Sequence, residues 1–219
     1  MRSHDLNRLL DEPGPGASVG PTHPSTRTQA IKPLAPVMSF VSRRSDVSGV
    51  AMQVVALPGR RSETEPWLRE LLLAAGLPDS GVVRYRHWNS AAEASVSIEA
   101  ALLSDQAPQL VVAKSLGTVI AATAFGHHGF RPVAAVLVGT PFRAISSEDL
   151  RLLQNFARGV ETLFIQQAED PGGSAAELHD ALQLTRGQVA AVPGNDHLYS
   201  DTSALVNALR PWAAQQPAP

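Results

Sequence analysis

The chain has no cysteine among its 219 residues, which excludes disulfide bonds, thiolate metal sites and a cysteine nucleophile. It also lacks an excess of either charge, because 18 Lys and Arg against 20 Asp and Glu give a net charge of -2. Nucleic acid is therefore not an expected partner. No run reaches the roughly 18 apolar residues of a membrane span, and residues 1–16 hold no apolar signal-peptide core. These absences predict a cytoplasmic protein that does not bind a membrane.

Two parts of the chain differ in composition and in hydrophobic periodicity. In residues 1–36, proline and glycine recur so often that no hydrophobic period survives, apart from a short helical pattern at residues 5–10. Such a segment buries too little apolar surface to offset its ordering entropy. We expect a disordered tail or a mis-assigned start rather than a partner-binding arm, and a single domain over residues 37–219.

Within that domain, short apolar runs alternate with helical patterns. The expected strands are residues 37–41, 52–57, 82–88, 110–113, 133–138, 160–165 and 188–192. The expected helices are residues 66–75, 91–105, 116–126, 147–158, 175–184 and 203–214. Apolar strands with helical crossovers predict an α/β fold, a mostly parallel central sheet with helices on both faces. Ligands of such sheets bind beyond the carboxyl ends of the strands.

One strand runs directly into a helix. Residues 109–117 read QLVVAKSLG, so the chain has to reverse sharply at Ser115. Ala113 and Gly117 are small, which allows the strand and the helix to approach closely. The turn places the Ser115 hydroxyl at the helix N-terminus, where free backbone N–H groups favour a developing anion. The alternative interpretation is a tight turn with a capping serine.

This strand–turn–helix resembles the nucleophile elbow of the α/β-hydrolase family, whose pattern is G-x-S-x-G. Ala113 stands here at the first glycine. The resemblance covers about residues 50–215. It implies an α/β-hydrolase fold in which Ser115 is the nucleophile. It also implies a minimal cap, because residues 142–159 leave room for one helix. No metal or organic cofactor is implied.

A serine nucleophile needs a base, and the base needs an orienting carboxylate. His197 lies in a PGNDH loop between the last strand and the last helix, where the family places its histidine. Asp170 lies in an Asp-Pro-Gly loop after the preceding strand and resembles the family's acid, with Glu169 as the second choice. The order Ser115, Asp170, His197 is the order of this fold. The alternatives are a solvated loop histidine and an Asx-Pro turn residue.

The oxyanion of such a reaction needs two N–H donors. We expect one to be the backbone N–H of Leu116 and the other that of Arg60, which follows a strand end where Gly59 lets the backbone turn. Phe142 is a candidate for the acyl pocket, with a core or turn role as the alternative. The side chains of Arg60 and Arg61 would either receive an acidic substrate or be solvated.

The resemblance implies a serine hydrolase that acts on a small ester or thioester through an acyl-enzyme. The competing hypothesis is a non-catalytic binding or scaffold protein on the same fold, because a fold does not fix a function. The sequence has no H-E-x-x-H motif, no P-loop and no G-x-G-x-x-G after a strand, so neither metal nor nucleotide binding is supported. The oligomeric state is left open.

Overall fold

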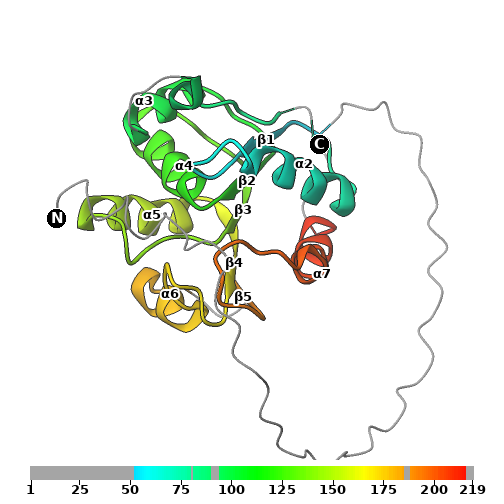
Figure 1. The fold of residues 1–219 in the computed structure, drawn as a ribbon. Helices are drawn as coiled ribbons and strands as arrows, with labels where there is room; N and C mark the ends of the chain where they lie inside the picture. Colours follow the sequence, from blue (N-terminus) through cyan, green and yellow to red (C-terminus); the bar gives the residue numbers. More distant parts are fainter. Residues whose placement is uncertain (1–51, 80, 90–93, 185–187, 216–219) are drawn as a thin grey trace, which may run out of the picture. The chain divides into compact units, whose positions relative to one another are not determined.

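A parallel sheet forms the centre of the domain. A computed structural model of the chain describes residues 52–79, 81–89, 94–184 and 188–215. The sheet order is β1-β2-β3-β4-β5, with every neighbouring pair parallel (Figure 1). The strands are β1 Val54–Leu57, β2 Leu110–Lys114, β3 Ala134–Val138, β4 Glu161–Gln167 and β5 Val189–Val192. The predicted α/β class is confirmed. The predictions for residues 1–41 lie outside the described residues.

Helices cover both faces of this sheet (Figure 1). On one face lie α2 Thr64–Ala75 and α7 Thr202–Ala213, which contact each other. On the other face lie α3 Val96–Ala100, α4 Leu116–His127, α5 Ser147–Gly159 and α6 Ala175–Leu182. Successive residues of a strand point to opposite faces of the sheet, as Val55 and Val54 of β1 do, and pack into two different hydrophobic clusters. Burial on both faces explains why the strands read as continuous apolar runs.

One predicted strand is wrong. Of residues 82–88, only Val82 makes a bridge, to Ala56 of β1, and η1 Arg86–Asn89 is a 3₁₀-helix. The physical reason is the Glu99 carboxylate, which accepts the backbone N–H groups of Arg86 and His87 at 3.1 Å each. A strand would need those donors for its neighbour. The predicted helix over residues 91–105 is also shorter, because α3 passes into η2 Ala101–Leu103. Residues 91–93 lie outside the described residues.

The direction of winding changes between β1 and β2. After β1 the chain moves outward to the bridge at Val82, and it then crosses back to β2 on the other side of β1. The carboxyl ends of β1 and β2 are in register, with Leu57 opposite Ala113. In doubly wound sheets, ligands bind at such a switch point. The residues that follow these two strands are therefore the first candidates for a ligand site.

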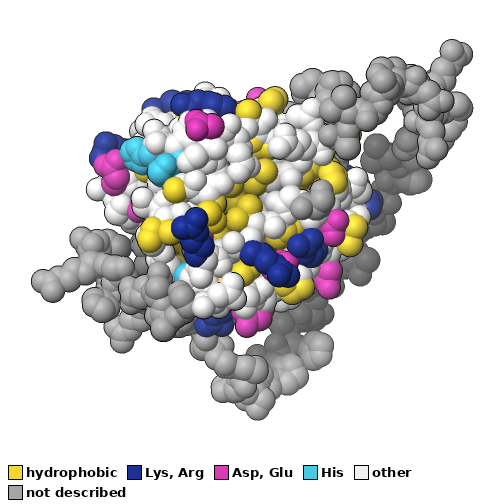
Figure 2. Space-filling view, turned by 90° about the horizontal axis from the view of Figure 1, so that it is seen from above, with side chains coloured by type: hydrophobic (Ala, Val, Ile, Leu, Met, Phe, Trp, Pro, Cys, Tyr) yellow, Lys and Arg dark blue, Asp and Glu magenta, His cyan; other side chains and the backbone are white. Residues whose placement is uncertain are grey.

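The side of the domain beyond β1 carries exposed apolar groups. Figure 2 looks down on this side and shows hydrophobic side chains gathered between Lys, Arg, Asp and Glu. Over all faces of the described residues, the large hydrophobic side chains that are exposed are Leu73 (63%), Val133 (55%), Ile98 (53%) and Leu198 (47%). Among the helices in the described ranges, none has the length and hydropathy needed to cross a bilayer.

Candidate active site

Ser115 sits at a strained turn between β2 and α4. Its φ is 50° and its ψ is −116°, a conformation that L-residues rarely adopt. The Ser115 N–H donates to the Val138 carbonyl of β3 at 2.9 Å, which fixes the turn at the edge of the sheet. A Cβ on Gly117 would lie 2.3 Å from the Leu57 carbonyl oxygen, so glycine is required for this close approach. The sharp reversal predicted from the sequence is present.

Ser115, His197 and Asp170 lie within hydrogen-bond distance of one another in series. His197 Nε2 is 2.9 Å from Ser115 Oγ, and His197 Nδ1 is 2.8 Å from Asp170 Oδ1 and 3.0 Å from Oδ2. The residues follow β2, β5 and β4, and they are 4%, 6% and 2% exposed. A carboxylate only accepts, so Nδ1 carries the proton and Nε2 is left to accept from the hydroxyl. Glu169, the second choice for the acid, is exposed.

The Asp170 carboxylate receives three different donors. Besides His197, the Gly172 N–H donates to Oδ1 at 2.7 Å and the Tyr199 hydroxyl donates to Oδ2 at 2.7 Å. The bond from the Gly172 N–H closes an Asx turn. Asp170 therefore has both the turn role considered above and the contact with the imidazole of His197. Burial, and then the charge of Asp170, raise the pKa of Tyr199 far above its ordinary value, which keeps this hydroxyl a donor.

The side chains of Gln167 and Asp196 hold the loop that carries His197. Gln167 Oε1 accepts the N–H groups of Asp196 and His197 at 3.1 Å each, and Gln167 Nε2 donates to Asp196 Oδ1 at 2.8 Å. Burial acts to raise the pKa of Asp196, but hydrogen bonds, led by those from Gln167 and the Tyr199 N–H, outweigh it and lower this pKa. His197 and Tyr199 have φ values of 56° and 60°. These bonds therefore stabilise a strained loop.

Lys114, the last residue of β2, also holds the loop that carries His197. Its side chain is buried, and Nζ donates to the His197 carbonyl oxygen at 3.0 Å. Nζ also lies 5.5 Å from the ring centroid of Trp67 and 5.6 Å from that of Tyr199. A buried ammonium needs such partners to compensate for its lost hydration. Lys114 thus ties the histidine loop to the strand that carries the serine.

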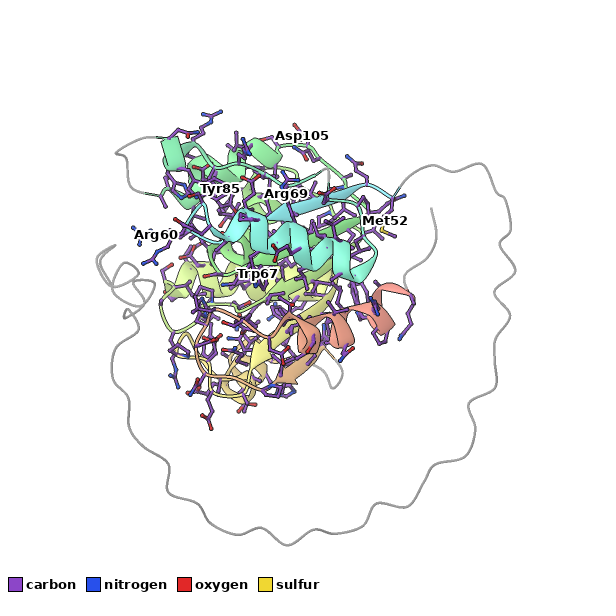
Figure 3. The ribbon with its side chains drawn as sticks, turned by 45° about the vertical axis from the view of Figure 1, so that its right-hand side comes forward. Met52, Arg60, Trp67, Arg69, Tyr85 and Asp105 are labelled. Atoms are coloured by element: carbon purple, nitrogen blue, oxygen red, sulfur yellow. The ribbon has the colours of Figure 1, made fainter. Side chains whose placement is uncertain are left out.

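The predicted oxyanion donors belong to the residue after Ser115 and to a loop that passes beside it. Leu116 is the first residue of α4, where an N–H has no acceptor within the helix. A Cβ on Gly59 would be 3.6 Å from Ser115 Cβ, so the loop that carries Arg60 runs beside the serine. Figure 3 shows Arg60 at the opposite end of β1 from Met52. The role of Leu116, Gly59 and Arg60 toward a substrate stays a prediction.

Phe142 packs against the loop that carries Asp170. A Cβ on Gly173 would lie 1.8 Å from Phe142 Cε1, and the Arg143 N–H donates to the Gly172 carbonyl at 3.0 Å. The ring is partly buried. This contact is the turn-and-core role considered above, and the acyl-pocket role stays a prediction.

Lys114, Gln167 and Tyr199 also contact the site residues, and none of these contacts was predicted from the sequence. A charge inside the apolar run of β2 is a usable signal, because a buried Lys is rare unless it is partnered. The others act through contacts between residues far apart in the chain. In the described ranges, no group of three His, Cys, Asp or Glu residues could hold a metal ion.

Comparisons with known proteins add no assignment: no family model, curated protein or solved structure matches this chain.

Proposed function

We propose that this protein is a serine hydrolase of the α/β-hydrolase type, acting on small esters or thioesters. The observation that carries the proposal is the hydrogen-bonded series from Ser115 Oγ through His197 to Asp170. A hydroxyl is a weak nucleophile until a neighbouring imidazole accepts its proton. The position at the winding switch, where ligands of doubly wound sheets bind, supports the proposal independently.

In this mechanism, Ser115 Oγ attacks the substrate carbonyl carbon while His197 Nε2 takes the hydroxyl proton. Asp170 holds the imidazole through Nδ1 and stabilises the imidazolium. The N–H groups of Leu116 and Arg60 donate to the oxyanion. The imidazolium then gives its proton to the leaving alcohol or thiol, and an acyl-enzyme forms. Water, deprotonated by His197, attacks the acyl carbon and releases the acid and the serine.

The low exposure of the nucleophile bears on the substrate. Ser115 is only 4% exposed and His197 only 6%, which favours a short acyl group over a polymer backbone. The same low exposure favours the second candidate, a binding protein on this fold without turnover, because a substrate carbonyl has little access to Ser115. The two candidates differ in whether Ser115 reacts.

Hydrolysis of p-nitrophenyl acetate and butyrate tests the proposal. Ser115→Ala and His197→Ala should each lose activity by about a thousandfold or more, because the chemistry needs both groups. His128→Ala is the matched control, since His128 caps the far end of α4 and should leave the rate unchanged. Folded wild-type protein that turns over neither ester nor a short thioester supports the binding protein instead. Full activity in Ser115→Ala moves the chemistry to another residue.

A further inference from the structure

A second hydrogen-bonded cluster lies behind the loop that carries Arg60. His87 Nε2 is 2.8 Å from the Arg60 carbonyl oxygen, and the Tyr85 hydroxyl donates to the Pro58 carbonyl at 2.8 Å. These two carbonyls belong to the peptides on either side of the Gly59–Arg60 peptide. The Arg60 N–H belongs to the peptide between them, so the two anchors set its direction. Figure 3 shows Tyr85 and Arg60 at the same end of the domain.

Both ring nitrogens of His87 face oxygen atoms. Nδ1 is 3.0 Å from Glu99 Oε1, while Nε2 faces the Arg60 carbonyl. A carbonyl and an ionised carboxylate only accept hydrogen bonds. The two bonds therefore exist together when the ring carries both protons. Glu99 is 2% exposed, and the N–H groups of Arg86 and His87 also donate to it, as a buried anion requires.

We propose that His87, as an imidazolium paired with Glu99, is a positioning residue that holds the Arg60 N–H in the direction the oxyanion needs. The inference rests on the proposed hydrolase function. When the ring loses a proton, Glu99 retains the remaining N–H on Nδ1, because charge-assisted hydrogen bonds are the stronger ones. The lone pair of Nε2 then faces the carbonyl oxygen of Arg60. The two repel, the peptide is released, and catalysis slows at alkaline pH.

The other groups that face His87 do not change their charge in this range, so the pH dependence comes from the His87–Glu99 pair. The Tyr85 ring stacks on His87 with centroids 5.4 Å apart. Burial, followed by the charge of Glu99, raises the pKa of Tyr85 well above its ordinary value of 10.0, so this phenol stays neutral. Arg86 is the preceding residue and Arg60 lies on the loop, and both guanidinium groups stay charged throughout. Trp88 donates to the Arg60 carbonyl at 2.8 Å and does not titrate.

The experiment measures kcat and KM for p-nitrophenyl butyrate across neutral and alkaline pH. Wild-type kcat should fall on the alkaline side. His87→Gln should lower kcat about ten- to hundredfold with little change in KM, and it should abolish the alkaline fall, because misplacing a group by about 1 Å costs up to about a hundredfold. In Glu99→Gln, the amide oxygen has to accept both the His87 N–H and the Nδ1–H, so Nε2 of the neutral ring has no proton for the Arg60 carbonyl. This variant should lower kcat as His87→Gln does, and it should also lose the alkaline fall.

Two variants act as controls, each with thermal melting to verify folding. His179→Gln removes a histidine of α6 that is bonded to Asp180, and its profile should match the wild type. Trp88→Phe removes the uncharged donor to the same Arg60 carbonyl. It should lower kcat at every pH and keep the alkaline fall.

A readout that needs no turnover is ¹⁵N nuclear magnetic resonance of histidine-labelled wild-type protein, with His87 assigned through His87→Gln. Both ring nitrogens of His87 should be protonated at the pH where kcat is highest. A neutral ring at that pH, or an alkaline fall that persists in His87→Gln, overturns the inference. If folded wild-type protein hydrolyses no ester, the proposed function fails instead, and the resonance result alone decides the state of the pair.

Discussion

The substitution Gly117→Ala tests the close packing of α4 on β1 that places Ser115. A Cβ at this position would lie 2.3 Å from the Leu57 carbonyl oxygen and 2.7 Å from the Pro58 carbonyl oxygen. Carbon–oxygen contacts between backbones are ordinarily about 3.3 Å or longer. Helix and strand would therefore have to separate by about 1 Å, which moves the serine away from the loop that carries Arg60.

The separation should affect stability and reactivity differently. Overpacking of this kind costs about 1–3 kcal/mol of unfolding free energy. A misplacement of about 1 Å costs up to about a hundredfold in rate. We therefore expect Gly117→Ala to fold with reduced stability and to react with a fluorophosphonate about a hundredfold more slowly than the wild type. Urea denaturation measures the first quantity, and the time course of labelling measures the second.

Gly76→Ala is the matched control. Gly76 ends α2 with a φ of 76°, and a Cβ there meets nothing within 4 Å. The left-handed conformation alone costs about 1–2 kcal/mol for alanine. This variant should lose comparable stability and keep the wild-type labelling rate. Equal labelling rates in the wild type and a folded Gly117→Ala would refute the argument that this contact positions the serine.

Three further substitutions test the surroundings of the site. Tyr199→Phe should lower the unfolding free energy by about 1.5–3 kcal/mol in urea, because Asp170 loses a hydrogen bond to a charged group; an unchanged value contradicts this. Lys114→Met should slow ester hydrolysis about tenfold, because the His197 carbonyl loses its donor; wild-type kinetics would show that this anchor is dispensable. Hydrogen bonds from Arg143, and then Ser174, lower the pKa of Glu177 from 4.5 to about 2, so its contribution to stability is present above pH 4.5 and is lost as the pH falls toward 2. The difference in Tm between the wild type and Glu177→Gln should therefore be present at pH 7 and shrink below pH 3, and a difference that stays constant with pH is the opposing result.

Much of the fold could be predicted because its signals are local. The apolar run of β2 followed at once by Ser115 and Gly117 indicates a strand, a reversal and a helix within nine residues. Asp170 and His197 could be selected because parallel strands bring their following loops to one edge of the sheet. Their distances from Ser115 are consequences of that topology.

The segment from Val82 to Asn89 could not be predicted in the same way. Its apolar and aromatic residues favour a strand, but Glu99, on the helical segment that follows, removes two backbone donors from the edge. Tyr199 likewise gives no sequence signal, because its contact with Asp170 spans 29 positions. Such contacts depend on the assembled fold, and no local period encodes them.

The central claim is that Ser115 is a nucleophile activated by His197. The most direct measurement is mass spectrometry of the wild-type protein after treatment with a fluorophosphonate, followed by peptide mapping. We predict one adduct, on Ser115, that is absent from Ser115→Ala and strongly reduced in His197→Ala and Asp170→Ala. Folded wild-type protein that carries no adduct, or carries it on another residue, would contradict the account.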